Sequence, residues 1–251
     1  MARRGQKKHL KRMPAPKHWP IMRKHGKFTT KPIPGPHGKE DCLTLAILLR
    51  EILGRAENMR EVKAILSVGD VTVDGRTRKD PRFPVGLMDV IEIKSSGDRF
   101  RLLPKRKGGL RLVSIDEAET KFKLGRIQKK QMVQGGKVQL TLHDGRSILL
   151  PDGAKPSEYT TLDTLVLSVP EQKLMDTISL EKGSHVVITQ GRNIGIEGKV
   201  VAIEKRIGTH ASTVTVEDPQ GTKFETALEY VFVLGKNKPK VSLGVVGGSS
   251  E

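Results

Sequence analysis

The stretch Ala64-Ile65-Leu66-Ser67-Val68-Gly69-Asp70-Val71-Thr72-Val73-Asp74-Gly75 decides the fold of the first half of the chain. Its opening residues place apolar side chains at helical spacing, and Gly69 is a residue type that commonly ends a helix. Val71-Thr72-Val73 has the composition of a strand, and Asp74-Gly75 is typical of a tight hairpin turn. The stretch therefore predicts a helix, a short strand and a turn in immediate succession.

The flanking residues extend this unit to about residues 42–104. Upstream, residues 43–53 are apolar nearly all round and predict a core helix that Asp41 caps and Gly54 ends. Asn58 is placed to cap the second helix, which we expect to run to about Ser67. Downstream, residues 90–93 predict a returning strand.

Positive charge is concentrated at the N-terminus. The 251 residues include 45 Lys and Arg against 28 Asp and Glu, and the net charge of +17 favours a polyanionic partner. Residues 1–39 contain no acid and few apolar residues, so we expect residues 1–41 to form an extended arm that becomes ordered only on a partner. Its candidate RNA-binding cations are Arg3, Arg4, Lys7, Lys8, Lys11, Arg12, Lys17, Arg23 and Lys24.

Trp19, the only Trp, stands among cations and prolines in Pro16-Lys17-His18-Trp19-Pro20. An aromatic ring in that setting suits stacking on a nucleic-acid base, so Trp19 is also a candidate RNA-binding residue. The alternative is that Trp19 anchors the arm on a neighbouring domain. The sequence leaves both open.

Residues 105–172 predict a β-rich central domain. Strands are expected over residues 122–127, 138–142, 147–150 and 165–169, with Asp144-Gly145 as a hairpin turn. The basic residues Lys105, Arg106 and Lys107 are candidates for phosphate contact, with a solvated surface as the alternative. Packing is the only role that the rest of this stretch indicates.

Residues 173–235 predict a small β-barrel, because five short strands follow one another within about fifty residues. Between the first two strands lie Gly191, Gly195 and Gly198, with Arg192 as a candidate RNA ligand. The spacing of these glycines fits neither a phosphate-binding P-loop nor a dinucleotide-binding loop. We therefore expect a docking loop, or a set of plain turns, and not a nucleotide pocket.

Several classes of protein are disfavoured. No apolar run is long enough to span a bilayer and no signal peptide is visible, which predicts a cytoplasmic protein without membrane contact. The single Cys42 has no Cys or paired His at metal-site spacing, so no metal is expected. No constellation of Asp, Cys or His with reactive spacing stands out, so we expect no enzyme activity, cofactor or small-molecule substrate.

Two segments resemble known RNA-associated modules. Residues 64–75 and 89–93 resemble the S4-type RNA-binding module, a helix pair followed by a short hairpin and a returning strand. In that family the second helix and the following loop face RNA, but the usual Arg-Leu-Asp opening is absent here, so its contact is not carried over. Residues 182–199 resemble a KOW motif. The first resemblance implies RNA contacts by Arg60, Lys63, Arg76 and Arg78, and the basic loop adds Lys79 and Arg82.

Nearly the whole chain is similar to the S4e family of archaeal and eukaryotic small-subunit ribosomal proteins. The similarity includes the opening Lys7-Lys8-His9-Leu10-Lys11-Arg12 with Ala15-Pro16-Lys17-His18-Trp19, the Pro-rich residues 32–38, both modules, the β-rich middle and the tail segment Gly235-Lys236-Asn237-Lys238-Pro239. We expect the C-terminal tail to comprise residues 236–251. Lys240 stands where the family suggests an aromatic. The short arm and tail fit an archaeal type. The resemblance implies a mostly β, multidomain α+β protein that binds ribosomal RNA and neighbouring ribosomal proteins in the small subunit.

Two other functions remain open. A transcription or translation factor with a KOW-type barrel would also carry basic RNA-binding modules. An RNA-modifying enzyme could bear an S4-type module, although the sequence offers no catalytic domain of suitable size. A ribosomal structural protein would stay with the small subunit through a high-salt wash, whereas a factor or an enzyme would leave.

Overall fold

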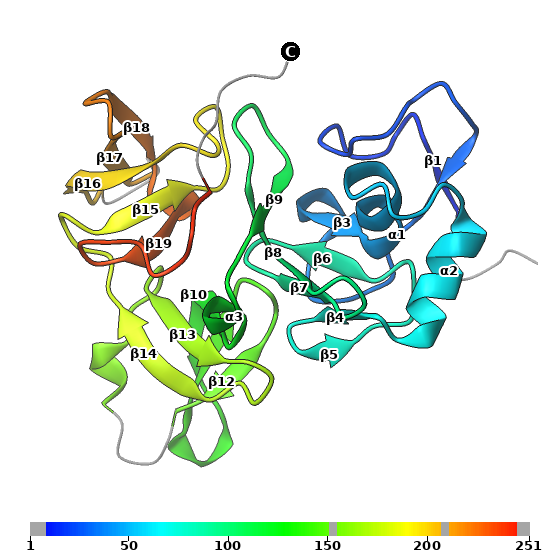
Figure 1. The fold of residues 1–251 in the computed structure, drawn as a ribbon. Coiled ribbons are helices and arrows are strands. Elements are labelled where there is room, and N and C mark those ends of the chain that lie inside the picture. The colour runs from blue at the N-terminus through cyan, green and yellow to red at the C-terminus, as the bar shows by residue number, and fades with distance from the viewer. Residues whose placement is uncertain (1–8, 151–154, 207–210, 245–251) are drawn as a thin grey trace, which may run out of the picture.

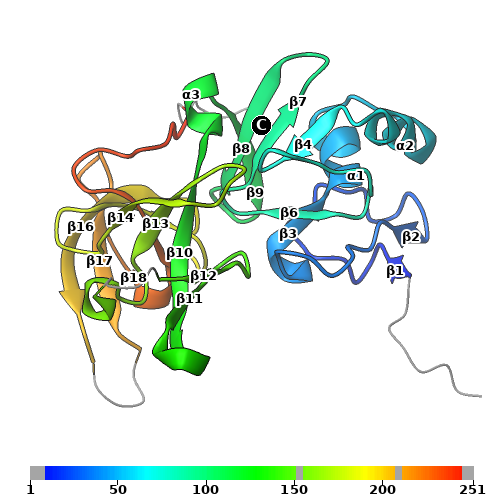
Figure 2. The same cartoon turned by 90° about the horizontal axis from the view of Figure 1, so that it is seen from below.

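Short antiparallel strands dominate the structure, a computed structural model that describes residues 9–150, 155–206 and 211–244. The arm and the S4-type module (residues 42–104) lie side by side in one half of the molecule, and two further sheets form the other half (Figures 1 and 2). Strands β8 (Asp98–Pro104) and β9 (Leu110–Ser114) run between the halves (Figure 1). The mostly β class with few helices is as the sequence predicted.

The S4-type module follows the predicted order. Helix α2 (Met59–Val68) starts at Asn58, whose side chain accepts hydrogen bonds from the amides of Arg60 and Glu61, and it ends at Gly69 with φ 84°. The five-stranded sheet has the order β5-β4-β7-β8-β9, and β3 and β6 pair separately. The remaining strands of the module are β3 (Cys42–Thr44), β4 (Val71–Val73), β5 (Arg76–Thr77), β6 (Pro84–Gly86) and β7 (Val90–Ile93).

The first helix begins two residues later than predicted. Residues 42–44 pair with β6, so they cannot take helical backbone angles, and Thr44, not Asp41, caps the helix through its hydroxyl oxygen. Helix α1 (Leu45–Ile47) continues as a π-helical turn (Leu48–Ile52), and Gly54 follows it with φ 61°. The apolar run is a core helix, as expected, but it is shorter.

The arm is more structured than its composition indicated. Strands β1 (Leu10–Lys11) and β2 (Phe28–Thr29) form a small hairpin, and a 3-10 turn (Lys39–Asp41) leads into β3. Leu10, Ala15 and Ile21 are buried in the same hydrophobic cluster as α1 and α2. The expectation of an extended arm is therefore wrong for residues 9–41, because a few scattered apolar residues suffice to dock it on an existing core.

The other half contains two five-stranded antiparallel sheets. The central sheet has the order β12-β11-β10-β13-β14 and the C-terminal sheet the order β18-β17-β16-β15-β19. The short helix α3 (Glu117–Thr120) precedes the central sheet. Strand bounds are β10 (Phe122–Met132), β11 (Val138–Leu142), β12 (Ser147–Leu149), β13 (Thr164–Ser168), β14 (Leu174–Ile178), β15 (His185–Ile188), β16 (Glu197–Glu204), β17 (Thr213–Glu217), β18 (Lys223–Ala227) and β19 (Val231–Gly235).

Sheet pairing crosses two of the expected domain boundaries. Position 104/105 lies within the β8–β9 hairpin, and position 172/173 lies between the paired strands β13 and β14. One hydrophobic cluster joins the three five-stranded sheets, since it contains Leu103 of β8, Leu124 of β10 and Phe232 of β19. The sheets thus share a core, and that core fixes the surface on which the cations are displayed.

Candidate nucleic-acid interface

A cationic groove lies between the arm and the S4-type module. It has a volume of about 1010 Å³ and is lined by Arg12, Phe28, Thr29, Thr30, Lys31, Arg50, Met59, Lys63, Ser67, Lys79, Asp80, Pro81 and Arg82. Six of these residues are Lys or Arg, and the single carboxylate, Asp80, is 3.3 Å from the Arg82 guanidinium. Such a groove suits a polyanion.

The groove brings together residues from five separate segments of the sequence. Lys63 lies on α2, Lys79 and Arg82 lie in the loop before β6, and Arg12 follows β1. Sequence reasoning named these four as candidate RNA-binding residues but did not include Lys31, a cation of the basic arm, or Arg50, which lies in the apolar helical run. Within the described part of the chain, the ammonium groups of Lys63 and Lys79 have no ion-pair or hydrogen-bond partner, so both can bind a phosphate.

The other S4-type candidates do not line the groove. Arg60 and Arg76 are exposed outside it. The Arg78 guanidinium lies 4.3 Å from the centre of the Phe83 ring, so part of its surface is used within the protein. The expected single face of Arg60, Lys63, Arg76 and Arg78 therefore contributes only Lys63 to the groove.

The arm uses two of its cations internally. Arg23 donates to the carbonyl oxygens of Ala15 (2.7 Å) and Pro16 (2.6 Å), and Arg12 donates to those of Met22 (2.8 Å) and Phe28 (3.2 Å). Both arginines hold the arm's loop closed, a use that sequence reasoning did not foresee. Lys11, Lys17 and Lys24 are exposed. The candidates Arg3, Arg4, Lys7 and Lys8 lie outside the described residues.

Trp19 anchors the arm. Its side chain is only 3% exposed, and its indole N–H donates to the Cys42 carbonyl at 2.7 Å. Burial also raises the pKa of the Cys42 thiol to about 12, so that thiol stays neutral. Between the two alternatives for Trp19, the structure supports the anchor, because a buried indole presents no free face to a base.

Phe28 is the aromatic residue that sequence reasoning missed. All six Phe, both Tyr and the Trp lie among the described residues, and Phe28 is the only one of them that is exposed, at 48%. It lines the cationic groove beside Arg12. No sequence pattern around Phe28 indicated exposure, since a Phe beside Thr29 and Thr30 equally suits a buried strand.

The turn between β8 and β9 carries the next group of candidates. Arg106 is bonded within the chain, because its guanidinium lies 2.9 Å from the Asp218 carboxylate after β17. Arg111 of β9 similarly contacts Glu197 of β16 at 2.6 Å. Lys105 and Lys107 are exposed. The turn is therefore fastened to the C-terminal sheet by its arginines and leaves its lysines available.

Gly195 makes a close approach, but to the chain's own backbone. A Cβ atom at that position would lie 2.5 Å from the Arg106 amide nitrogen, and the residue has φ 77°. Part of the 191–198 loop thus packs on the β8–β9 turn instead of facing a partner. Arg192 in the same loop is exposed and has no bonding partner among the described residues.

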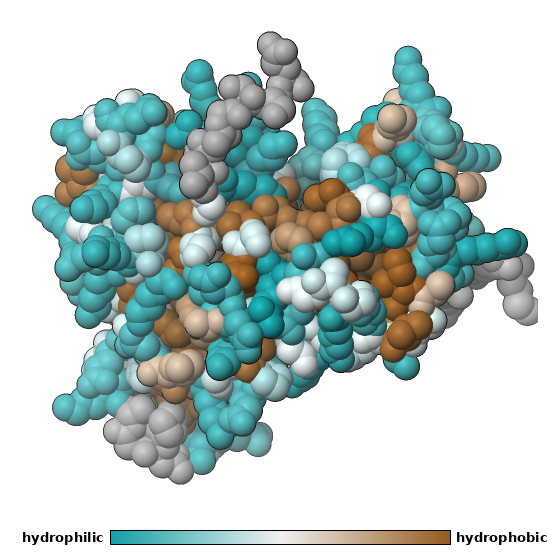
Figure 3. All heavy atoms as spheres, in the orientation of Figure 1, coloured by the Kyte–Doolittle hydropathy of each residue, from teal (hydrophilic) through white to brown (hydrophobic). Residues whose placement is uncertain are grey.

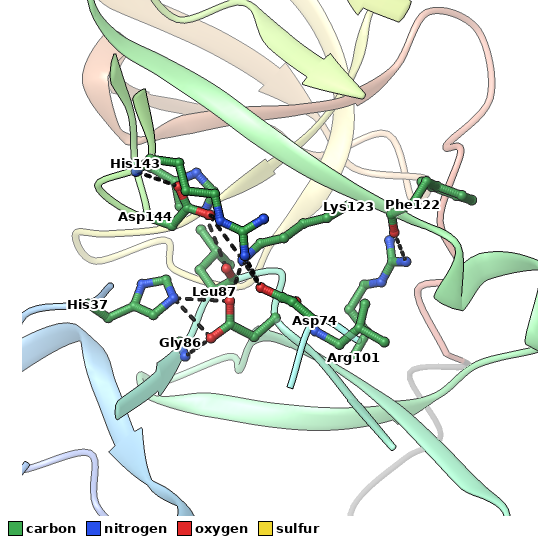
Figure 4. Close-up of polar contacts among 12 residues, drawn as sticks. His37, Asp74, Gly86, Leu87, Arg101, Phe122, Lys123, His143 and Asp144 are labelled. Atoms are coloured by element: carbon green, nitrogen blue, oxygen red, sulfur yellow. Dashed lines mark hydrogen bonds and ion pairs between the residues drawn. The ribbon is translucent and has the colours of Figure 1, made fainter. Parts of the chain in front are cut away.

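A second charged group, here called the junction cluster, is buried where the two halves meet (Figure 4). The Lys123 ammonium of β10 lies 2.5 Å from Asp89, 2.8 Å from Asp74 and 3.1 Å from Asp144, and its side chain is 1% exposed. His37 of the arm contacts Asp89 at 3.0 Å, and Arg146 contacts Asp74 and Asp144. The junction cluster thus ties the arm, the S4-type module and the central sheet together.

Mutual attraction keeps Asp89 and Lys123 ionised although both are buried. Burial alone would raise the pKa of Asp89, but the Lys123 ammonium and His37 lower it well below its ordinary value. Burial alone would lower the pKa of Lys123, but Asp89, Asp74 and Asp144 raise it instead. Sequence reasoning missed this cluster, because its members are scattered over residues 37–146 and no spacing links them.

The described residues contain no group of three or more His, Cys, Asp or Glu that could hold a metal ion. No helix in the described ranges is long and apolar enough to cross a membrane. On the face seen in Figure 3, hydrophobic residues gather across the middle, where the halves meet, and hydrophilic residues surround them.

Three family models match the sequence. The model described as ribosomal family S4e matches residues 96–174, the RS4NT domain matches residues 4–40 and the S4 domain matches residues 45–91. The S4 match covers most of the module that the sequence indicated. The S4e match spans β8 to the start of β14, and so joins the hairpin of that module to the central sheet.

Whole-chain relatives agree with these models. The small ribosomal subunit protein eS4 of Staphylothermus marinus is 50% identical over 247 residues, which cover 97% of this chain and 98% of that protein. The eS4 protein of Methanocaldococcus jannaschii is 42% identical, covering 97% and 100%. The crystal structure of the 30S ribosomal protein S4e from Thermoplasma acidophilum has a TM-score of 0.64 at 31% identity, covering 79% of this chain and 97% of that one. The chain belongs to the ribosomal family S4e, the family that its sequence resembled.

Proposed function

We propose that this protein is a structural constituent of the small ribosomal subunit and that it binds ribosomal RNA through the cationic groove. The relatives named small ribosomal subunit protein eS4, which match almost end to end, support the first part. They do not favour the alternative of a KOW-containing transcription or translation factor. As partners we propose small-subunit ribosomal RNA and neighbouring ribosomal proteins, in the ribosomes of the cytoplasm.

One observation carries the RNA-binding part of the proposal. Lys63 and Lys79 meet in one groove from distant segments, and neither has an internal partner among the described residues. Elsewhere the structure pairs or caps many of its cations, as with Arg23, Arg106 and Arg111. Unpaired ammonium groups that converge on one groove can release counterions from a phosphate backbone, which is the main source of affinity for RNA.

Further contacts extend from the groove. We propose that the exposed Lys11, Lys17 and Lys24 of the arm, together with Arg60, Arg76, Lys105, Lys107 and Arg192, add phosphate contacts. We propose that Arg3, Arg4, Lys7 and Lys8, which lie outside the described residues, also contact RNA. We also propose that residues 173–235 are a KOW-type unit that docks on RNA or protein, and that the chain has no catalytic role or cofactor.

Charge reversal in the groove tests the proposal. The double variant Lys63→Glu with Lys79→Glu should weaken binding to small-subunit ribosomal RNA. It should also flatten the plot of log affinity against log salt by about 0.7–0.9 for each phosphate that the variant no longer neutralises. Neither side chain belongs to the core, so the free energy of unfolding should hardly change.

Lys121→Glu with Lys129→Glu is the matched control, since both residues are exposed, lie outside the groove and change the net charge equally. Binding is measured by titration of labelled RNA, and retention by sedimentation of reconstituted small subunits through a high-salt wash. An unchanged salt slope in the groove variant, or equal reductions of affinity in groove variant and control, would contradict the groove as the RNA site.

A further inference from the structure

Phe28 gives the cationic groove a second kind of contact. Its ring is the only exposed aromatic side chain of Phe, Tyr or Trp, and it lies in the groove that also holds Lys63 and Lys79. An aromatic face among unpaired cations is the combination that binds single-stranded nucleic acid, where the ring stacks on a base and the cations contact phosphate. A groove built only for a duplex backbone needs no such ring.

The backbone at Phe28 is held in place. Phe28 pairs with Lys11 in the β1–β2 hairpin, and its carbonyl oxygen accepts a hydrogen bond from the Arg12 side chain at 3.2 Å. The Arg12 amide also donates to the Lys27 carbonyl at 3.1 Å. The ring is therefore presented by an ordered hairpin, which lowers the entropic cost of binding.

The surroundings of the ring suit a planar, weakly polar ligand. His9 stands with its ring centre 5.2 Å from that of Phe28, tilted by 43°, and the Lys27 ammonium lies 5.6 Å from the ring centre. Met59 and Pro81 add apolar lining to the same groove. His9 and Lys27 are themselves exposed, so they can shift beside an incoming ligand.

We propose that the groove holds an unpaired nucleotide of the RNA, with its base stacked on Phe28 and its phosphates on Lys63 and Lys79. This inference rests on the proposed RNA-binding function of the same groove. It adds selectivity, because the face of a base within a duplex is covered by its neighbours, whereas a bulged or looped-out base is free to stack. The groove would thus bind preferentially to unpaired sites in ribosomal RNA.

The test compares two RNA probes with the full-length protein. One is a short single strand that carries 2-aminopurine, whose fluorescence is quenched when it stacks, and the other is a blunt duplex with the same number of phosphates. Phe28→Ala should weaken binding of the single strand about fivefold to a hundredfold and abolish the quenching, because the stacking of one base is removed. Its binding to the duplex and its salt slope should not change.

Three further variants complete the design. Phe28→Tyr should keep affinity and quenching, and Phe28→Leu should lose both although it preserves apolar bulk. Met13→Ala is the control, since Met13 is an exposed apolar residue of the arm outside the groove. If Phe28→Leu binds the single strand like the parent, the ring serves only as an apolar contact and the stacking proposal fails. If Phe28→Ala weakens both probes equally, its selectivity for unpaired bases fails.

These outcomes separate the two proposals. Suppose that the parent protein binds both probes with a steep salt dependence and that Phe28→Ala behaves identically. The stacking proposal would then be wrong, and the proposed function would remain. If the double variant Lys63→Glu with Lys79→Glu binds both probes like the parent, the groove is not the RNA-binding site, and the stacking proposal fails as well.

Discussion

The cationic groove and the junction cluster use the same kind of side chain for opposite purposes. In the groove, the ammonium groups of Lys63 and Lys79 face solvent without a partner among the described residues. In the junction cluster, the Lys123 ammonium is enclosed by three carboxylates and is almost inaccessible. We therefore expect a cation of this protein to contact RNA only where the structure leaves it unpaired.

The comparison also explains how one chain can be both strongly basic and well folded. A buried cation without partners would be costly, so each buried cation of the junction cluster is matched by carboxylates. Many of the Lys and Arg residues behind the net charge of +17 lie at exposed positions, where repulsion is screened by salt. Substitutions in the junction cluster should therefore change the stability of the protein, and substitutions in the groove should change its salt-dependent affinity for RNA.

The largest effect is expected from Lys123→Met. Removing this ammonium leaves Asp74, Asp89 and Asp144 close together in a buried site, and breaking a buried ion pair in this way costs about 3–5 kcal/mol. The free energy of unfolding is measured by urea denaturation. In the absence of urea, where the variant is folded, the slope of its log affinity for RNA against log salt should match that of the parent.

Lys129→Met is the control for that measurement, because Lys129 lies on the same strand but is exposed. If Lys123→Met does not fold at all, Asp144→Asn offers a milder change that leaves two carboxylates on Lys123. A stability of Lys123→Met equal to that of Lys129→Met would remove the distinction between the two regions.

A pH dependence of stability is the next largest effect, centred on His143 beside the junction cluster. Its Nε2 is 3.2 Å from the Leu87 carbonyl oxygen and its Nδ1 accepts from the Arg126 amide at 3.2 Å, so both nitrogens suit the neutral ring. Burial lowers the pKa of His143 from 6.5 to about 4, and the nearby Lys123 contributes while Asp144 opposes.

The sign follows from proton binding. Between pH 6.5 and 4 the unfolded chain binds a proton at residue 143 that the folded chain does not, so stability falls as the pH is lowered, by on the order of 1–3 kcal/mol in total. Urea denaturation across this range should show a shallower decline for His143→Gln. The exposed His25→Gln should follow the parent, and an identical slope in His143→Gln would mean that His143 is not the group responsible.

Local signals allowed much of the fold to be predicted. Asn58, Gly69 and Asp74-Gly75 act on their immediate neighbours. Helix α2 starts after Asn58 and ends at Gly69, and the chain turns at Asp74-Gly75, as predicted. The predicted start of the first helix was wrong because residues 42–44 pair with a strand 40 residues away. Such pairing has no local signature.

The site was predictable only as a list of exposed cations. Which of them meet, as Lys63, Lys79 and Arg12 do, depends on how distant segments pack. The same limit explains the two aromatics: Trp19 stands among cations yet is buried, whereas Phe28 has no marked context yet is exposed. Burial is decided by the tertiary core, which neighbouring residues do not encode.

The smallest effects are expected in the turn between β8 and β9, where a paired and an unpaired cation are neighbours in the sequence. Arg106 is paired with Asp218, whereas Lys105 beside it is exposed without a partner among the described residues. Arg106→Ala should lower the free energy of unfolding by about 0.2–1 kcal/mol, the usual value of a surface ion pair, and leave the salt slope for ribosomal RNA unchanged. Lys105→Ala should do the reverse, flattening the slope by up to about 0.7–0.9 without a change in stability.

Because the two residues are neighbours, differences in local RNA placement cannot account for opposite outcomes. Equal effects of both variants on the salt slope would show that internal pairing does not decide which cations reach RNA.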